Sequence, residues 1–183
     1  MGGGVALITA SERDDIKAVV AINPSLGWDT IIEWLAKNQD IETPANLYNK
    51  RLAERWKGLM KLSPEMGGQN SLLHRIPRID APVVFLQGTA DESVIWQVVE
   101  NFAHQMEDAD KKVKLVIYPD GVHGLNQQYS IERNNEIMGW LAEYGLENPG
   151  LFDTSIIPND IDDGTIISKD LIEVPDQNPE INI

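Results

Sequence analysis

Three short apolar runs alternate along the chain with segments of helical periodicity. The runs cover residues 17–23, 83–88 and 113–118, and a turn follows each of them. The segment 93–106 places apolar residues at helical spacing, namely Ile95, Val98, Val99, Phe102 and Met106. Continuous apolar strands joined by a helix are typical of parallel strands that are buried on both faces. The pattern therefore predicts an α/β fold, with a parallel sheet flanked by helices.

The strand–helix alternation is interrupted between residues 25 and 76. Apolar residues at helical spacing predict a short helix near 31–35 and a second one near 48–59. Three tryptophans of this segment are candidates either for the lining of a pocket or for core packing: Trp28, Trp34 and Trp56. Core packing is the more common use of such a side chain.

A last helix is predicted from Ser130 to Gly145, and the pattern changes after it. Residues 147–183 contain four prolines and no helical stripe, so we expect a first domain over 1–146 followed by an acidic tail or linker. The sequence of the tail around Gly164 is also compatible with a small hairpin or with a calcium-binding loop. Ile161 speaks against calcium, because it stands where such a loop needs an oxygen ligand.

Composition and charge narrow the classes of function. A hydrophobic content of 42% is typical of a globular protein, and the lack of cysteine excludes disulfides and thiolate metal sites. The net charge of −14, half of it carried by residues 150–183, argues against a nucleic-acid partner. No apolar stretch is long enough to span a membrane, and no signal peptide is visible. We therefore expect neither nucleic acid nor a membrane as a partner.

Two residues suited to acid–base chemistry follow neighbouring strands of the predicted sheet. Asp91 comes after the run 83–88, and His123 comes after the run 113–118. Parallel strands end on the same edge of a sheet, where open α/β sheets place their sites, and adjacent strands lie about 5 Å apart. The two side chains are therefore expected to meet although 32 positions separate them. A carboxylate that orients an imidazole is one half of a nucleophile–histidine–acid triad.

Simpler interpretations of both residues exist. Aspartate favours turns because its side chain bonds the nearby backbone, so Asp91 can be a turn residue alone. His123 can be a loop residue without a chemical role. The other histidines, His74 and His104, are interpreted as structural or exposed, since one lies in a connecting segment and the other in the predicted helix.

Two motifs in this part of the chain resemble those of a known family. Leu86–Val94 is similar to the "hGxxDxxV" acid loop of α/β-hydrolases, and Val116–Gly124 is similar to their "YPxxxHG" histidine loop. The closest resemblance, over about residues 1–146, is to the catalytic domain of the prolyl oligopeptidase family, with the dienelactone hydrolases near it. It implies the C-terminal half of an α/β-hydrolase fold. Residues 25–76 then form a helical segment that crosses over the sheet.

The N-terminal segment Met1–Ala10 resembles the second half of a nucleophile elbow. Gly2 and Gly3 match the glycines that follow the nucleophile in this family. The resemblance implies that the nucleophile, a serine or a cysteine, precedes Met1, and that the backbone N–H of Met1 donates to the oxyanion hole. The alternative is a glycine-rich start to an ordinary helix.

The resemblance implies a serine-type hydrolase, a peptidase or an esterase, that acts by acyl transfer to water. Asp91 and His123 are its expected catalytic residues in this chain, the expected substrate is a small ester or a peptide, and no metal or organic cofactor is expected. Because the nucleophile is not among these 183 residues, we expect the chain alone to be inactive. The competing hypothesis is a non-catalytic hydrolase remnant that serves as a binding or scaffold module. The oligomeric state stays open.

Overall fold

The computed structural model describes residues 2–62, 72–125 and 128–145, with the side chains of 56–62 excepted. The predicted tail at 147–183 lies outside the described residues. Its hairpin and its calcium loop therefore stay predictions.

The centre of the fold is a three-stranded parallel sheet. Its strands lie in the order β1 (Val19–Ile22), β2 (Val83–Gly88) and β3 (Val113–Tyr118). The register pairs Ile22 with Leu86 and Gly88 with Tyr118, so the carboxyl ends of the strands lie side by side. Each strand falls within one of the predicted apolar runs, and the predicted parallel sheet is confirmed.

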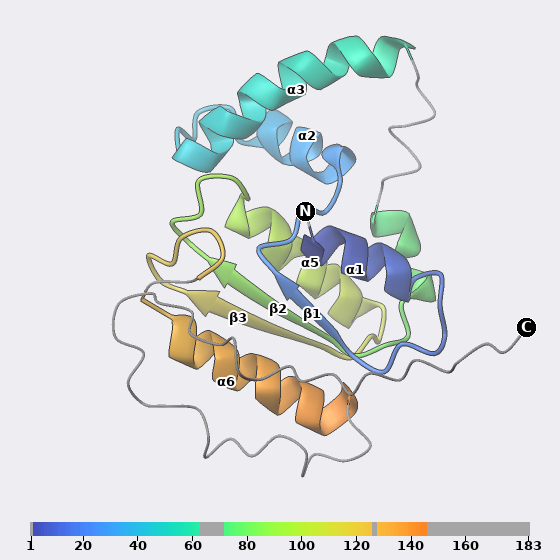
Figure 1. Ribbon diagram of the computed structural model, residues 1–183. Helices are drawn as coiled ribbons and strands as arrows, with labels where there is room; N and C mark the ends of the chain where they lie inside the picture. The colour runs from blue at the N-terminus through green and yellow to red at the C-terminus, as the bar shows by residue number, and fades with distance from the viewer. Residues whose placement is uncertain (1, 63–71, 126–127, 146–183) are drawn as a thin grey trace, which may run out of the picture. The chain divides into compact units, whose positions relative to one another are not determined.

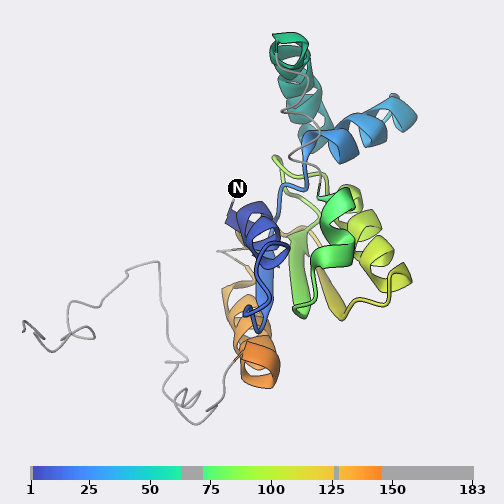
Figure 2. The ribbon, with the colours of Figure 1, turned by 90° about the vertical axis from the view of Figure 1, so that its right-hand side faces the viewer.

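Helices cover both faces of this sheet (Figures 1 and 2). Helices α1 and α5 lie on one face, and α6 lies on the opposite face. In chain order the helical elements are α1 (Gly2–Ala10), α2 (Trp28–Lys37), α3 (Pro44–Leu62), the 3₁₀ helix η1 (Leu73–Arg78), α5 (Trp96–Asp108), α6 (Ser130–Trp140) and the π-helical turn η2 (Leu141–Gly145). The two helices expected between residues 25 and 76 are therefore present as α2 and α3.

The apolar stripe of α5 forms the larger core with β2. Every residue of the predicted stripe is buried, and the rings of Phe85 and Phe102 meet edge to face at 6.0 Å between centroids. The helix begins at Trp96, three residues later than the predicted start at Ser93. The reason is that the backbone N–H groups of Ser93 and Val94 bond to the side chain of Asp91, which holds this segment in a turn.

A smaller core on the other face joins the sheet to α6. Val84 and Leu86 pack there with Tyr118 and Trp140, and Ile137 and Tyr144 border them. The burial of Trp140 was not anticipated; its ring lies 4.6 Å from that of Tyr144. Burial of the Tyr118 hydroxyl raises the pKa of that group, because its charged form would lose contact with water.

The loops that follow β2 and β3 contact each other directly because Gly88 has no side chain. A Cβ atom at Gly88 would lie 2.0 Å from the backbone oxygen of Gly121. That oxygen accepts the N–H of Ala90 at 3.0 Å, and Thr89 donates its N–H to Tyr118 O at 3.0 Å. The backbones of the two loops are thereby fixed to each other just before Asp91 and His123.

We expect the Gly88→Ala substitution to lower the free energy of unfolding by about 3 kcal/mol or more, because the new methyl group meets a backbone carbonyl that cannot rotate away. Gly139→Ala in α6 is the matched control, since nothing lies within 4 Å of its Cβ position. It should stabilise the protein by up to about 1 kcal/mol. Urea denaturation measures both, and a Gly88 variant as stable as the Gly139 variant contradicts the close approach of the loops.

Candidate active site

Asp91 and His123 meet at the carboxyl edge of the sheet. Asp91 lies in the loop after β2 and His123 in the loop after β3, and Nδ1 of the imidazole is 2.8 Å from Oδ2 of the carboxylate. The predicted meeting of the two side chains is thus confirmed. The side chain of Asp91 is 0% exposed, whereas that of His123 is 51% exposed. The carboxylate is therefore sealed inside the protein while the second ring nitrogen, Nε2, is left for other partners.

The buried carboxylate of Asp91 has a hydrogen-bond partner at each of its four acceptor positions. Oδ1 accepts the backbone N–H groups of Ser93 at 2.7 Å and Val94 at 2.9 Å. Oδ2 accepts a hydrogen bond from Nδ2 of Asn23 at 2.7 Å, in addition to the one from His123. A buried charge requires such compensation. The two interpretations of Asp91 both hold, since one oxygen makes the local turn and the other faces the imidazole.

Asn23 is the residue of this site that the sequence analysis missed. It follows β1 directly, is 1% exposed, and adopts φ 43°, a left-handed conformation that asparagine tolerates better than most residues. Its amide nitrogen donates to Asp91, and its Oδ1 accepts the backbone N–H of Gly124 at 3.0 Å. Asn23 therefore connects the end of β1 to the acid and to the residue after His123.

The histidine loop is held from a second side by α6. Arg133 donates from Nη1 to the backbone oxygen of Gly124 at 2.7 Å, so both polar groups of Gly124 are bound by side chains. Tyr129 donates its hydroxyl hydrogen to Pro119 O at 2.6 Å, near the start of the same loop. Gly124 has φ 84°, a conformation that favours glycine. These contacts fix the backbone that carries His123.

The other candidate residues of the sequence do not join this site. His74 is exposed in η1. His104 is also exposed, and its hydrogen bond to Glu107 at 3.0 Å raises its pKa. This second histidine–carboxylate pair lies in solvent, unlike the buried carboxylate of Asp91. Met1, the expected oxyanion donor, lies outside the described residues.

A pocket of about 300 Å³ lies beside His123. Segments from α2, α3, the turn after β1 and the loop after β2 surround it, and most of its lining is apolar. Trp28 lines this pocket and also packs against the larger core, so both of its predicted roles hold. Trp34 packs against the core and lines a second pocket instead of this one, and the side chain of Trp56 is not described.

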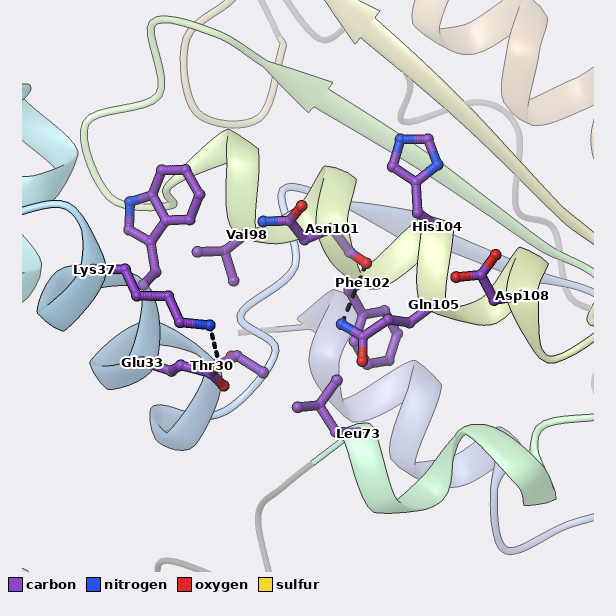
Figure 3. Close-up of a pocket in the computed structure, with 11 residues that line it drawn as sticks. Thr30, Glu33, Lys37, Leu73, Val98, Asn101, Phe102, His104, Gln105 and Asp108 are labelled. Atoms are coloured by element: carbon purple, nitrogen blue, oxygen red, sulfur yellow. Dashed lines mark hydrogen bonds and ion pairs between the residues drawn. The ribbon is translucent and has the colours of Figure 1, made fainter.

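A second pocket, of about 400 Å³, lies between α2, η1 and α5 (Figure 3). Its rim carries the ion pair of Lys37 and Glu33, 2.6 Å apart and largely exposed. Neither Asp91 nor His123 contributes to its lining. This second pocket is therefore separate from the acid–imidazole pair.

Neither metal ligation nor a membrane span is indicated for the part of the chain that the structure describes. Within residues 2–62, 72–125 and 128–145, no group of three histidine, aspartate or glutamate side chains is arranged to hold a metal ion. Over the same ranges, no helix combines the length and the apolar character that a bilayer crossing needs.

Sequence comparisons relate the chain to hydrolases. The profile of the prolyl oligopeptidase family matches residues 1–146. Over 75 residues the chain is 29% identical to a protein of Salmonella typhimurium strain LT2 that is named as a carboxymethylenebutenolidase. That match covers 37% of this chain and 28% of the relative.

Solved structures show the same fold. An acylaminoacyl peptidase in complex with Z-Gly-Gly-Phe-chloromethyl ketone matches with a TM-score of 0.58 at 18% identity, over 76% of this chain and 22% of the peptidase. An esterase of Pyrococcus furiosus matches with a TM-score of 0.53 at 20% identity, over 79% of this chain and 50% of the esterase. The fold is that of an α/β-hydrolase, and the chain spans half or less of the length of these relatives.

We expect replacement of Asn23 to destabilise the fold in two separable ways. Asn23→Gly tolerates the left-handed backbone but removes both hydrogen bonds, and it should lower the free energy of unfolding by about 2 kcal/mol. Asn23→Ala adds backbone strain and should cost about 1 kcal/mol more. Chemical denaturation gives both values. A glycine variant as stable as the wild type means that Asn23 does not support the buried carboxylate.

Proposed function

Because the chain belongs to the prolyl oligopeptidase family, we propose that it supplies the histidine and the acid of a triad that transfers an acyl group from an ester or a peptide to water. The observation that carries this proposal is the 2.8 Å contact between a fully buried carboxylate and a half-exposed imidazole. The pocket beside His123 supplies an apolar surface for the substrate. The family itself is one of hydrolases, which fits this chemistry.

In the proposed reaction, Asp91 fixes the protonation of the imidazole. A carboxylate only accepts hydrogen bonds, so Nδ1 of His123 carries a hydrogen and Nε2 of the neutral ring keeps its lone pair. Nε2 takes the proton of the attacking nucleophile and later passes it to the leaving alcohol or amine. The positive charge that forms on the ring faces the carboxylate of Asp91. No metal or organic cofactor enters these steps.

We assign the nucleophile to a serine or cysteine that precedes Met1 in the intact enzyme. Among the described residues, no hydroxyl group hydrogen-bonds to His123. Ser25 and Ser93 line the same pocket without such a bond, and the hydroxyl of Ser11 donates to Ile8 O instead. The described serines therefore lack the nucleophile–base contact of a triad.

The position of α1 supports this assignment. A Cβ atom at Gly4 would lie 2.3 Å from Ser25 O, and one at Gly3 would lie 3.0 Å from Cβ of Pro24. These glycines let the start of α1 pack closely against the segment after β1, at the edge that carries His123. In this arrangement the nucleophile stands before the helix, and the backbone N–H of Met1 takes part in the oxyanion hole.

We expect no hydrolysis of p-nitrophenyl acetate or of a chromogenic peptide by the 183-residue chain above its own His123→Ala variant, because nothing in it is acylated. A protein that also contains the upstream segment should turn over both substrates. There, His123→Ala should lower kcat by about 10⁴-fold or more, and Asp91→Asn by about 10⁴-fold. His104→Ala is the matched control, since it removes an exposed histidine that also bonds a carboxylate, and it should leave kcat unchanged.

Two results decide against this proposal. Turnover by the 183-residue chain that depends on His123 means that the nucleophile lies within the chain. An upstream reading frame that stops without a Gly-x-Ser or Gly-x-Cys motif favours the alternative, a hydrolase remnant that serves as a binding or scaffold module.

A further inference from the structure

The pocket beside His123 contains one buried amide side chain in a mostly apolar lining. Asn49 of α3 is 3% exposed and lines the pocket together with apolar residues of α2, α3 and the loop after β2. These apolar residues include Trp28, Ile31, Leu52 and Val94. A buried polar group among apolar neighbours requires a hydrogen-bond partner for each of its polar atoms.

The orientation of the Asn49 amide is fixed by two backbone carbonyls. Nδ2 donates to Ala45 O at 2.8 Å and to Ser93 O at 2.9 Å. Since both partners are acceptors, the nitrogen must face them, and both of its hydrogens are used. The oxygen Oδ1 is therefore turned away from these carbonyls.

Asn49 lines the pocket, and because its amide nitrogen already donates to two backbone carbonyls, its oxygen is the end that is available to an occupant. This oxygen accepts no hydrogen bond from the described residues. An amide oxygen only accepts, whereas the hydroxyls of Ser25, Ser93 and Tyr48, which also line the pocket, can either donate or accept. Besides Nε2 of His123, which the proposed reaction uses, Asn49 Oδ1 is the group in this lining that can only accept, so it requires a donor from the occupant.

We propose that this pocket binds an aromatic side chain that ends in an O–H donor, and that Asn49 Oδ1 accepts this hydrogen. This inference rests on the proposed function. Under that function, the pocket next to His123 is the subsite for a side chain of the peptide or acyl substrate. The apolar lining holds the ring, and the amide oxygen selects rings that carry a donor. Tyrosine-like groups are then preferred over phenylalanine-like groups.

Equilibrium binding tests this preference without any turnover. The 183-residue chain is titrated with N-acetyl-L-tyrosinamide, N-acetyl-L-phenylalaninamide and N-acetyl-O-methyl-L-tyrosinamide, while NMR follows the side-chain N–H signals of Asn49 and Trp28. The tyrosine compound should bind about fivefold more tightly than the phenylalanine compound, the gain typical of one net hydrogen bond. The O-methyl compound has the oxygen but no donor, so it should show no such gain.

A pair of substitutions tests whether Asn49 causes the preference for the tyrosine compound. Asn49→Leu keeps the approximate size of the side chain and removes the acceptor, so the ratio of the two affinities should fall to about one. Asn46→Leu is the matched control, because Asn46 is buried in the same helix, donates to Ile41 O and does not line the pocket. Its ratio should stay near the wild-type value.

Each result of the titration has a definite meaning. Equal affinities for the tyrosine and phenylalanine compounds in the wild-type chain, or no change in the signals of Asn49 and Trp28 with any compound, overturn the proposal even if a variant fails to fold. Selective binding together with a failed hydrolysis test on the extended protein leaves the pocket assignment in place and rejects only the catalytic one.

Discussion

The burial of the Asp91 carboxylate is the constraint on which the rest of the site depends. A charged group with no exposed side-chain surface is tolerated only when its oxygens are fully hydrogen-bonded. Its donors come from its own loop, from Asn23 at the end of β1 and from His123 after β3. Satisfying one carboxylate therefore brings three chain segments, far apart in sequence, to one place.

The parallel sheet makes this arrangement possible before any side chain is placed. All three strands end on one edge, and the missing side chain of Gly88 lets the loops after β2 and β3 bond through their backbones. Asn49 connects α3 to this hydrogen-bond network. Its Nδ2 donates to Ser93 O, while the N–H of Ser93 donates to the Asp91 carboxylate. The apolar pocket and the acid–imidazole pair are thus linked through the acid loop, in addition to His123, which belongs to both.

The features that the sequence predicted correctly depend on local patterns. Apolar runs and helical spacing are sufficient for the strands, for α5 and for the edge on which Asp91 and His123 meet, since parallel strands have a common direction. The late start of α5 was missed because the Asp91 turn competes for the same backbone N–H groups.

The roles of Asn23 and Asn49 could not be predicted because they arise from contacts with distant residues. Asn23 lies 68 positions from Asp91, and Asn49 lies 44 positions from Ser93. No periodicity in the sequence marks either contact. The one available signal for Asn23 is a polar residue directly after an apolar strand, at the same edge as the acid and the histidine.

The most direct test of the account is the position of the proton on the neutral imidazole of His123. In the 183-residue chain at alkaline pH, ¹⁵N NMR of the ring nitrogens should show the hydrogen on Nδ1 and a bare Nε2, because the Asp91 carboxylate can only accept. In Asp91→Asn, whose amide can donate to Nδ1, the hydrogen should move to Nε2. A wild-type ring that carries its hydrogen on Nε2 contradicts the claim that Asp91 orients His123 as a base.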